Sequence, residues 1–170
     1  SIEFLRKKGI AKASKKMSRT ASEGLALVNH KDGEVSIIEI NSETDFVAKN
    51  EDFISFCKEV SDICFSQKGD MQKINSSPMK NKITVNDNLI DLIAKIGEKI
   101  TLRRSNFFND KEGVNFSYVH SAKEKNIGKI ISIVKLSNTN DTKEIGPKLA
   151  MHIAALNPLS IDKDGLSKDI

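Results

Sequence analysis

The chain has 170 residues, of which 38% are hydrophobic and 29% are charged, and its formal net charge is +4 at pH 7. This composition is typical of a soluble chain large enough for one substantial core or two small adjoining ones. Its longest apolar runs are only a few residues, which excludes a membrane-spanning helix, and it shows no secretory signal, so we expect a cytoplasmic location.

The positive charge is concentrated near the N-terminus. Seven basic residues and no acidic residue lie between Leu5 and Ser22, namely Arg6, Lys7, Lys8, Lys12, Lys15, Lys16 and Arg19. Subtracting these seven from the 27 basic residues leaves 20 against 23 acidic residues, so the rest of the chain is slightly negative. The segment is either an electrostatic patch for RNA or an acidic protein, or a solvated, weakly helical connector. It has no interleaved aromatic residues for base stacking, which weakens the RNA interpretation.

The next segment predicts a β-hairpin followed by a helix. Strand-like segments at 24–30 and 34–41 flank an Asp32-Gly33 pair, which is a strong hairpin signal. From Asn50 the apolar spacing becomes helical, with one apolar face formed by Phe53, Phe56, Cys57, Val60 and Cys64. This helix should lie across the hairpin. The two cysteines are about 10 Å apart along such a helix, beyond disulfide reach, so we expect buried thiols rather than metal ligands.

Residues 67–84 are polar and have no sustained period, which predicts a long loop. Thr84 or Asn86 then caps a second helix that ends at Gly97. Its apolar face contains Leu89, Ile93 and Ile96. Residues 99–103 alternate as a strand does, and pairing this strand with the hairpin predicts a three-stranded sheet backed by two helices.

The last part of the chain repeats the arrangement of the first. Residues 116–121 and 128–136 predict a strand pair, and Asp141 with Glu144 predicts a capping box that opens a helix. We expect one face of that helix to be apolar and the helix to end at Pro158, with His152 as a core histidine. The predicted face contains Ile145, Leu149, Ile153 and Leu156.

These elements predict an α+β fold with two adjoining lobes, each an antiparallel sheet covered by helices, preceded by a basic helical connector. Residues 1–22 hold the end of an N-terminal helical module and the basic connector, residues 23–110 the first lobe, and residues 111–170 the second lobe. A hairpin with one helix is marginal alone. We therefore expect the second lobe to be incomplete, and the chain to begin partway through a larger protein.

The segment 42–50 stands where the hairpin gives way to the first helix, and such corners are exposed. It places the carboxylate of Asp45 beside the ring of Phe46. One interpretation is structural: Thr44 or Asp45 caps the following helix, and Phe46 is a core residue beneath the corner. The other is that the corner presents Asp45 and Phe46 to a partner.

The run Thr44-Asp45-Phe46-Val47, with Asn41 before it and Ala48-Lys49-Asn50 after it, closely resembles the signature of the elongation factor Ts family. Further segments resemble the same family in the same order, namely Leu5 to Gly9, Ala21 to Gly24, Ile96-Gly97, His120 and Met151-His152. Members of that family are guanine-nucleotide exchange factors for elongation factor Tu. The family fold has a small N-terminal helical module, two α+β core lobes and, in many members, a coiled-coil excursion.

The resemblance implies which residues bind the partner. Phe46 inserts between helices of the GTPase domain of elongation factor Tu, with Asp45 beside it, so that magnesium coordination is lost. Ile96, Gly97 and His120 lie at or near the interface. The implied partner-binding set is Thr44, Asp45, Phe46, Val47, Ile96, Gly97 and His120.

The sequence does not indicate an enzyme. It has no nucleophile elbow and no Gly-rich phosphate loop, and His30, His120 and His152 are too scattered to bind a metal. We expect no cofactor, no direct nucleotide binding, no membrane contact and no nucleic-acid partner. The alternative is a basic ribosome- or RNA-associated α+β binding protein that uses residues 6–19.

Overall fold

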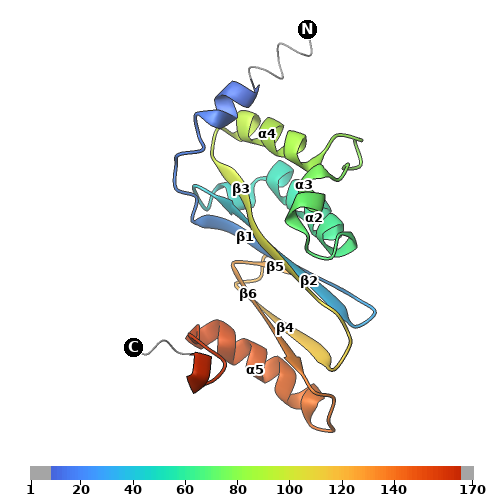
Figure 1. The fold of residues 1–170 in the computed structure, drawn as a ribbon. Coiled ribbons are helices and arrows are strands. Elements are labelled where there is room, and N and C mark those ends of the chain that lie inside the picture. The colour runs from blue at the N-terminus through green and yellow to red at the C-terminus, as the bar shows by residue number, and fades with distance from the viewer. Residues whose placement is uncertain (1–8, 166–170) are drawn as a thin grey trace.

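The structure, a computed structural model, describes residues 9–165 (Figure 1). Residues 9–14 are helical, and the basic residues Arg6, Lys7 and Lys8 lie outside the described range. The elements that follow are β1 (Glu23–Lys31), β2 (Glu34–Ser42), the 3-10 turn η1 (Val47–Lys49), α2 (Glu51–Ser66), α3 (Met71–Ser76), α4 (Val85–Ile96), β3 (Ile100–Phe108), β4 (Val114–His120), β5 (Ile127–Gly128), β6 (Ile130–Leu136), α5 (Thr142–Leu156) and the 3-10 turn η2 (Lys163–Gly165).

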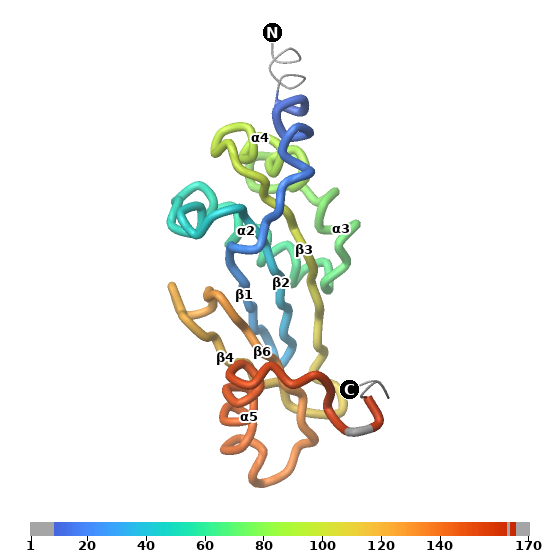
Figure 2. Tube along the Cα trace, turned by 90° about the vertical axis from the view of Figure 1, so that its left-hand side faces the viewer, coloured from blue at the N-terminus to red at the C-terminus, as the bar shows by residue number. Residues whose placement is uncertain are grey.

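The strands form two antiparallel sheets, which confirms the predicted α+β class. The larger sheet has the order β3-β2-β1-β5, and the smaller one pairs β4 with β6. Figures 1 and 2 show α2 to α4 and α5 at opposite ends of the molecule, with the strands between them. None of the helices in the described range is both long enough and apolar enough to cross a membrane.

The predicted hairpin is confirmed. Asp32 and Gly33 have φ values of 51° and 83°, the left-handed pair that a two-residue type I′ turn requires. β3 pairs with β2 from Ser42↔Ile100 to Val35↔Phe108, with a register shift between Glu39 and Ile40. It extends beyond the predicted 99–103 because its later half is a charged and polar edge strand, where apolar alternation is lost.

The main core lies between one face of the larger sheet and the helices that cover it. The predicted face of α2 is confirmed, since Phe53, Cys57, Val60 and Cys64 are each 0% exposed and Phe56 is 6% exposed. Both cysteines are free. Burial raises the pKa of the Cys57 thiol well above its usual value and that of Cys64 to about 11. They are therefore packing residues that stay protonated at neutral pH.

The helices follow local side-chain chemistry, with two differences from prediction. Asn50 caps α2 by accepting a hydrogen bond from Phe53 N, so neither Thr44 nor Asp45 caps that helix. Thr84, one of the two predicted caps, caps α4, and Gly97 ends that helix with φ 83° as predicted. The short helix α3 was not predicted, because only Ile74 is buried on it and its start depends on the Asp70 side chain.

The second strand pair is confirmed, but its second strand is divided between the two sheets. Ile127 and Gly128 pair with β1 in the larger sheet, whereas Ile130–Leu136 pairs with β4 in the smaller one. A Cβ on Gly128 would lie 2.6 Å from Val119 Cγ1, so only glycine fits this crossing. The short strand β5 thus follows the predicted boundary near residue 110 in the chain but belongs to the larger sheet.

Three predictions for α5 are wrong, namely those of its cap, its buried face and its core histidine. Asp141 makes no side-chain cap; instead Thr142 Oγ1 accepts from Thr139 N and donates to Ser137 O. The buried face consists of Thr142, Gly146 and Ala150. A Cβ on Gly146 would lie 2.2 Å from the Phe116 ring, which shows how closely the helix backbone approaches the sheet.

The predicted apolar stripe of α5 is consequently only partly covered. Ile145 is 51% exposed and Leu156 is 63% exposed, while Leu149 and Ile153 are only partly buried. His152 is exposed, so it is not a core histidine. The helix ends at Leu156, with Asn157 in a left-handed conformation, shortly before Pro158.

Candidate partner-binding corner

The corner comprises residues 43–46, which follow β2 and lead into η1. Phe46 is 74% exposed, whereas the next residue, Val47, is only 4% exposed and belongs to the core. Among the phenylalanines that the structure describes, Phe46 alone is exposed. The interpretation of Phe46 as a core residue is therefore wrong: Val47 anchors the turn, and the Phe46 ring lies on the surface.

Lys49 is the charged neighbour of the corner. Its Nζ lies 3.4 Å from the Asp45 carboxylate and 5.4 Å from the centroid of the Phe46 ring. Both ends of the ion pair are largely solvent-exposed, and such a pair contributes only about 0–1 kcal/mol. Asp45 and Phe46 can therefore exchange these contacts for contacts with a partner at little cost.

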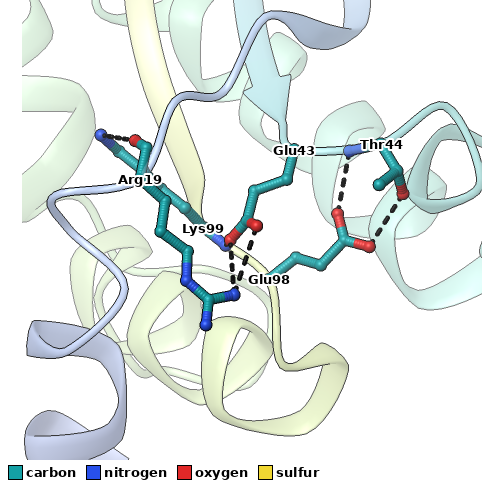
Figure 3. A network of polar contacts seen from close by, with 5 residues as sticks. All are labelled: Arg19, Glu43, Thr44, Glu98 and Lys99. Atoms are coloured by element: carbon teal, nitrogen blue, oxygen red, sulfur yellow. Dashed lines mark hydrogen bonds and ion pairs between the residues drawn. The ribbon is translucent and has the colours of Figure 1, made fainter.

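Carboxylates hold the corner against the turn between α4 and β3 (Figure 3). Glu98 accepts two hydrogen bonds from Thr44, one from its backbone N at 3.0 Å and one from Oγ1 at 2.8 Å. In the opposite direction, Glu43 Oε1 accepts from the backbone N of Lys99 at 2.5 Å. This bond is the main reason why the pKa of Glu43 lies below its ordinary value.

Further contacts of Glu43 and Lys99 bring the connector to the corner. Arg19 Nη1 lies 3.3 Å from Glu43 Oε2, and Lys99 Nζ donates to the backbone oxygens of Met17 and Arg19. Three segments that are distant in sequence thus meet at one place: the end of the connector, the corner and the turn after α4.

The structure brings together most of the residues predicted to bind a partner. Ile96 and Gly97 immediately precede Glu98, so the end of α4 lies beside the Thr44–Val47 segment. His120 is exposed at the end of β4. Within the described residues, no hydrogen bond joins His120 to the corner; instead Lys123, in the following loop, donates to Ala48 O at 2.5 Å.

Three residues that support the corner were not predicted from the sequence. Glu43, Glu98 and Lys123 were given no role, because surface carboxylates and lysines are common and their partners are distant in sequence. The only local signal was the helix stop at Gly97, directly before Glu98.

A cavity lies elsewhere in the molecule. It has a volume of about 430 Å³, lies between the larger sheet and β6, and is lined by residues such as Glu39, Arg104 and Ile130. No residue of the corner lines it. The exposed Phe46 side chain at the corner suits contact with a macromolecule better than it suits enclosure of a small ligand.

Most of the chain matches the model of one known protein family. The family model for elongation factor Ts matches residues 43–170, which begins at the corner and includes every residue predicted to bind a partner. The chain belongs to the elongation factor Ts family. Its β2–η1 corner and its α4–β3 turn are therefore segments of that family.

Individual members of that family are similar to almost the whole chain. The chain is 42% identical to elongation factor Ts of Xanthobacter autotrophicus over 173 residues, covering 99% of this chain and 56% of the relative. It is 41% identical to elongation factor Ts of Azorhizobium caulinodans, with 99% and 56% covered. It is 43% identical to that of Rhodopseudomonas palustris strain BisB5, with 100% and 56% covered. The chain thus spans just over half the length of the relatives that it matches.

Proposed function

We propose that this chain is the part of a guanine-nucleotide exchange factor that binds elongation factor Tu and promotes release of GDP. The observation that carries the proposal is a phenyl ring, 74% exposed, on a corner whose backbone is tied to a neighbouring turn. Family membership supports the choice of partner. No chemical reaction and no cofactor are required, and translation places the protein in the cytoplasm.

The proposed mechanism is a wedge. Phe46 inserts between helices of the partner's GTPase domain, and Asp45 exchanges Lys49 for groups on the partner, so that the magnesium and phosphate ligands are displaced. Burying an exposed Phe side chain contributes roughly 1.5–3 kcal/mol. This amount corresponds to about a tenfold to hundredfold preference for the partner conformation that accepts the ring.

Exchange then follows from thermodynamic linkage. If the factor binds the nucleotide-free partner more tightly than the GDP-bound partner, then binding of the factor must weaken the partner's affinity for GDP by the same ratio. The factor therefore accelerates release and leaves when nucleotide returns. Nothing in this cycle requires the factor itself to touch the nucleotide.

The remaining predicted residues take supporting roles in this proposal. Val47 anchors the corner in the core, and Thr44 connects it to Glu98. Ile96 and Gly97 extend the contact surface along the end of α4. His120 adds contacts from the second lobe, next to the loop in which Lys123 reaches η1.

The test is release of labelled GDP from elongation factor Tu on addition of this chain. We expect Phe46→Ala to reduce the maximal release rate by at least about tenfold, because the variant has no ring to bury between helices of the partner. The matched control is Ile83→Ala, which truncates another exposed apolar side chain, 43% exposed, away from the corner. Equal release by the Phe46→Ala variant and the unsubstituted chain would refute the proposal.

A further inference from the structure

We propose that Glu98 is a positioning residue for Phe46: its carboxylate holds the corner backbone in the conformation that presents the ring. This inference rests on the proposed exchange function. It concerns a residue that does not itself need to touch the partner.

The Phe46 ring does little to position itself. Phe46 is 74% exposed, and the charged group over its ring is the exposed Lys49 Nζ, 5.4 Å from the ring centroid. The direction of the ring is therefore set by the backbone of residues 43–46. That backbone follows the last ladder pair of the sheet, in which Ser42 lies opposite Glu23 and Ile100, so sheet hydrogen bonding does not hold it.

Glu98 supplies the support that the ladder does not. Its two oxygens accept from the backbone N and the hydroxyl of the same residue, Thr44, two positions before Phe46. Hydrogen bonds to an ionised acceptor are stronger than neutral ones, and two bonds to one residue fix an orientation as well as a distance. Ser42 Oγ also donates to Thr44 O, so the peptide groups before and after the Thr44 Cα are both held.

The helix stop before Glu98 explains how its carboxylate reaches the corner. Gly97 has φ 83°, and a Cβ there would meet no atom within 4 Å. Glycine is therefore needed for the backbone conformation rather than for space, and that conformation turns the chain so that Glu98 faces Thr44. The reciprocal bond from Lys99 N to Glu43 holds the same two segments together a second time.

Loss of this support has a specific kinetic signature. If the corner adopts several conformations, only a fraction of the molecules presents the ring correctly, and the apparent dissociation constant rises by the inverse of that fraction. At saturating factor the ring still inserts. We therefore expect Glu98→Ala to raise the half-saturating concentration in the GDP-release assay by about tenfold with little change in the maximal rate. Phe46→Ala, in contrast, should lower the maximal rate.

Two variants serve as controls. Glu98→Gln keeps an oxygen that accepts from Thr44 N, and its amide can donate to Thr44 Oγ1, so it should restore most of the lost affinity. Glu144→Ala removes an exposed carboxylate from α5 and should leave the half-saturating concentration unchanged. If Glu98→Ala does not fold, Glu98→Asp, which is one methylene too short to reach both Thr44 atoms, should shift the same constant in the same direction.

A second measurement needs no partner. Amide hydrogen exchange of the free chain should accelerate about tenfold at residues 44–48 in Glu98→Ala, while the amides of β1 and β2 keep their protection. An unchanged half-saturating concentration, an equal loss in Glu98→Gln and Glu98→Ala, or unaltered amide exchange at the corner would overturn the positioning role. Failure of Phe46→Ala to affect GDP release would instead overturn the proposed function, whatever the amide exchange shows.

Discussion

The two helix-covered sheets of this molecule differ in how much core supports them. Among the residues that the structure describes, the large side chains that are less than 2% exposed lie between Leu27 and Ile100, in the unit formed by β1 to β3 and α2 to α4. In the second unit the contact between α5 and its sheet is made by small residues, with Gly146 and Ala150 against the strands. The exposed Phe46 is attached to the better-packed unit. The difference suggests why an exposed ring can stand at this corner: the next residue, Val47, belongs to the large core.

The largest expected effect comes from the core behind the corner. Phe53 is 0% exposed and lies seven residues after the exposed Phe46. Truncating each ring therefore compares the stability contributed by a buried and by an exposed phenylalanine. Phe53→Ala should lower the free energy of unfolding by about 3–5 kcal/mol, because it leaves a cavity. Phe46→Ala should change it by less than about 0.5 kcal/mol. Urea denaturation of both variants measures this difference, and a similar loss in both would show that Phe46 is structural.

The second prediction compares the units as wholes. We expect amides of residues 114–156 to exchange with solvent at least about tenfold faster than those of residues 23–108, because fewer large side chains must be exposed to open the second unit. The paired strands β4 and β6 give the cleanest comparison with β1 and β2. Equal protection in the two sets would mean that the small-residue contact of α5 is as stabilising as the large core.

A third prediction concerns the pH dependence of the corner. The hydrogen bond from Lys99 N and the nearby Arg19 hold the pKa of Glu43 below its ordinary value of 4.5. Because the folded pKa is lowered, the carboxylate contributes stability above about pH 4.5, and this contribution is lost as the pH falls through the lowered value.

The amide signal of Lys99 in an NMR titration should report this change. It should be constant from neutral pH down to about pH 4.5 and then shift with a midpoint below 4.5. The Glu43→Gln variant is the control and should lack the transition. A midpoint at or above 4.5 would contradict the contacts described for Glu43.

The smallest effect is expected at the connector. Lys12 and Lys15 are exposed and Lys16 is partly so, and they make no contact with Phe46 or Asp45 that the structure describes. Neutralising all three to Gln should reduce GDP release less than Phe46→Ala does, with a modest dependence on salt. Pulldowns with and without nuclease test the alternative of RNA binding. Loss of RNA binding with full exchange would add a second activity to the protein.

Much of the first unit could be predicted because its signals are local. Asp32-Gly33 favours one turn type, the α2 apolar residues repeat with a helical period, and Gly97 ends a helix wherever it lies in the fold. The family signature around Phe46 was also recognisable from residue order alone. Each of these inferences depends on residues within about one or two turns of one another.

Other features depend on contacts that the sequence does not encode locally. The apolar stripe from Ile145 to Leu156 has good helical spacing. However, α5 packs on the sheet through Gly146, because a residue without a Cβ lets the helix backbone lie against the Phe116 ring. Spacing shows that a helix has two faces but not which one a neighbour covers. Residues 128–136 were predicted as one strand, but Gly128 lets the chain cross from one sheet to the other.

The candidate site shows the same division most clearly. That Asp45 and Phe46 stand at a corner follows from the order of strand, turn and helix in the chain. That Phe46 is exposed, and that Glu98 holds Thr44 across 54 positions, follows only from how α4 and β3 pack beside the end of β2. A hydrogen bond requires two groups within about 3 Å of each other. Packing of the whole unit, rather than any run of residues, brings these two groups together.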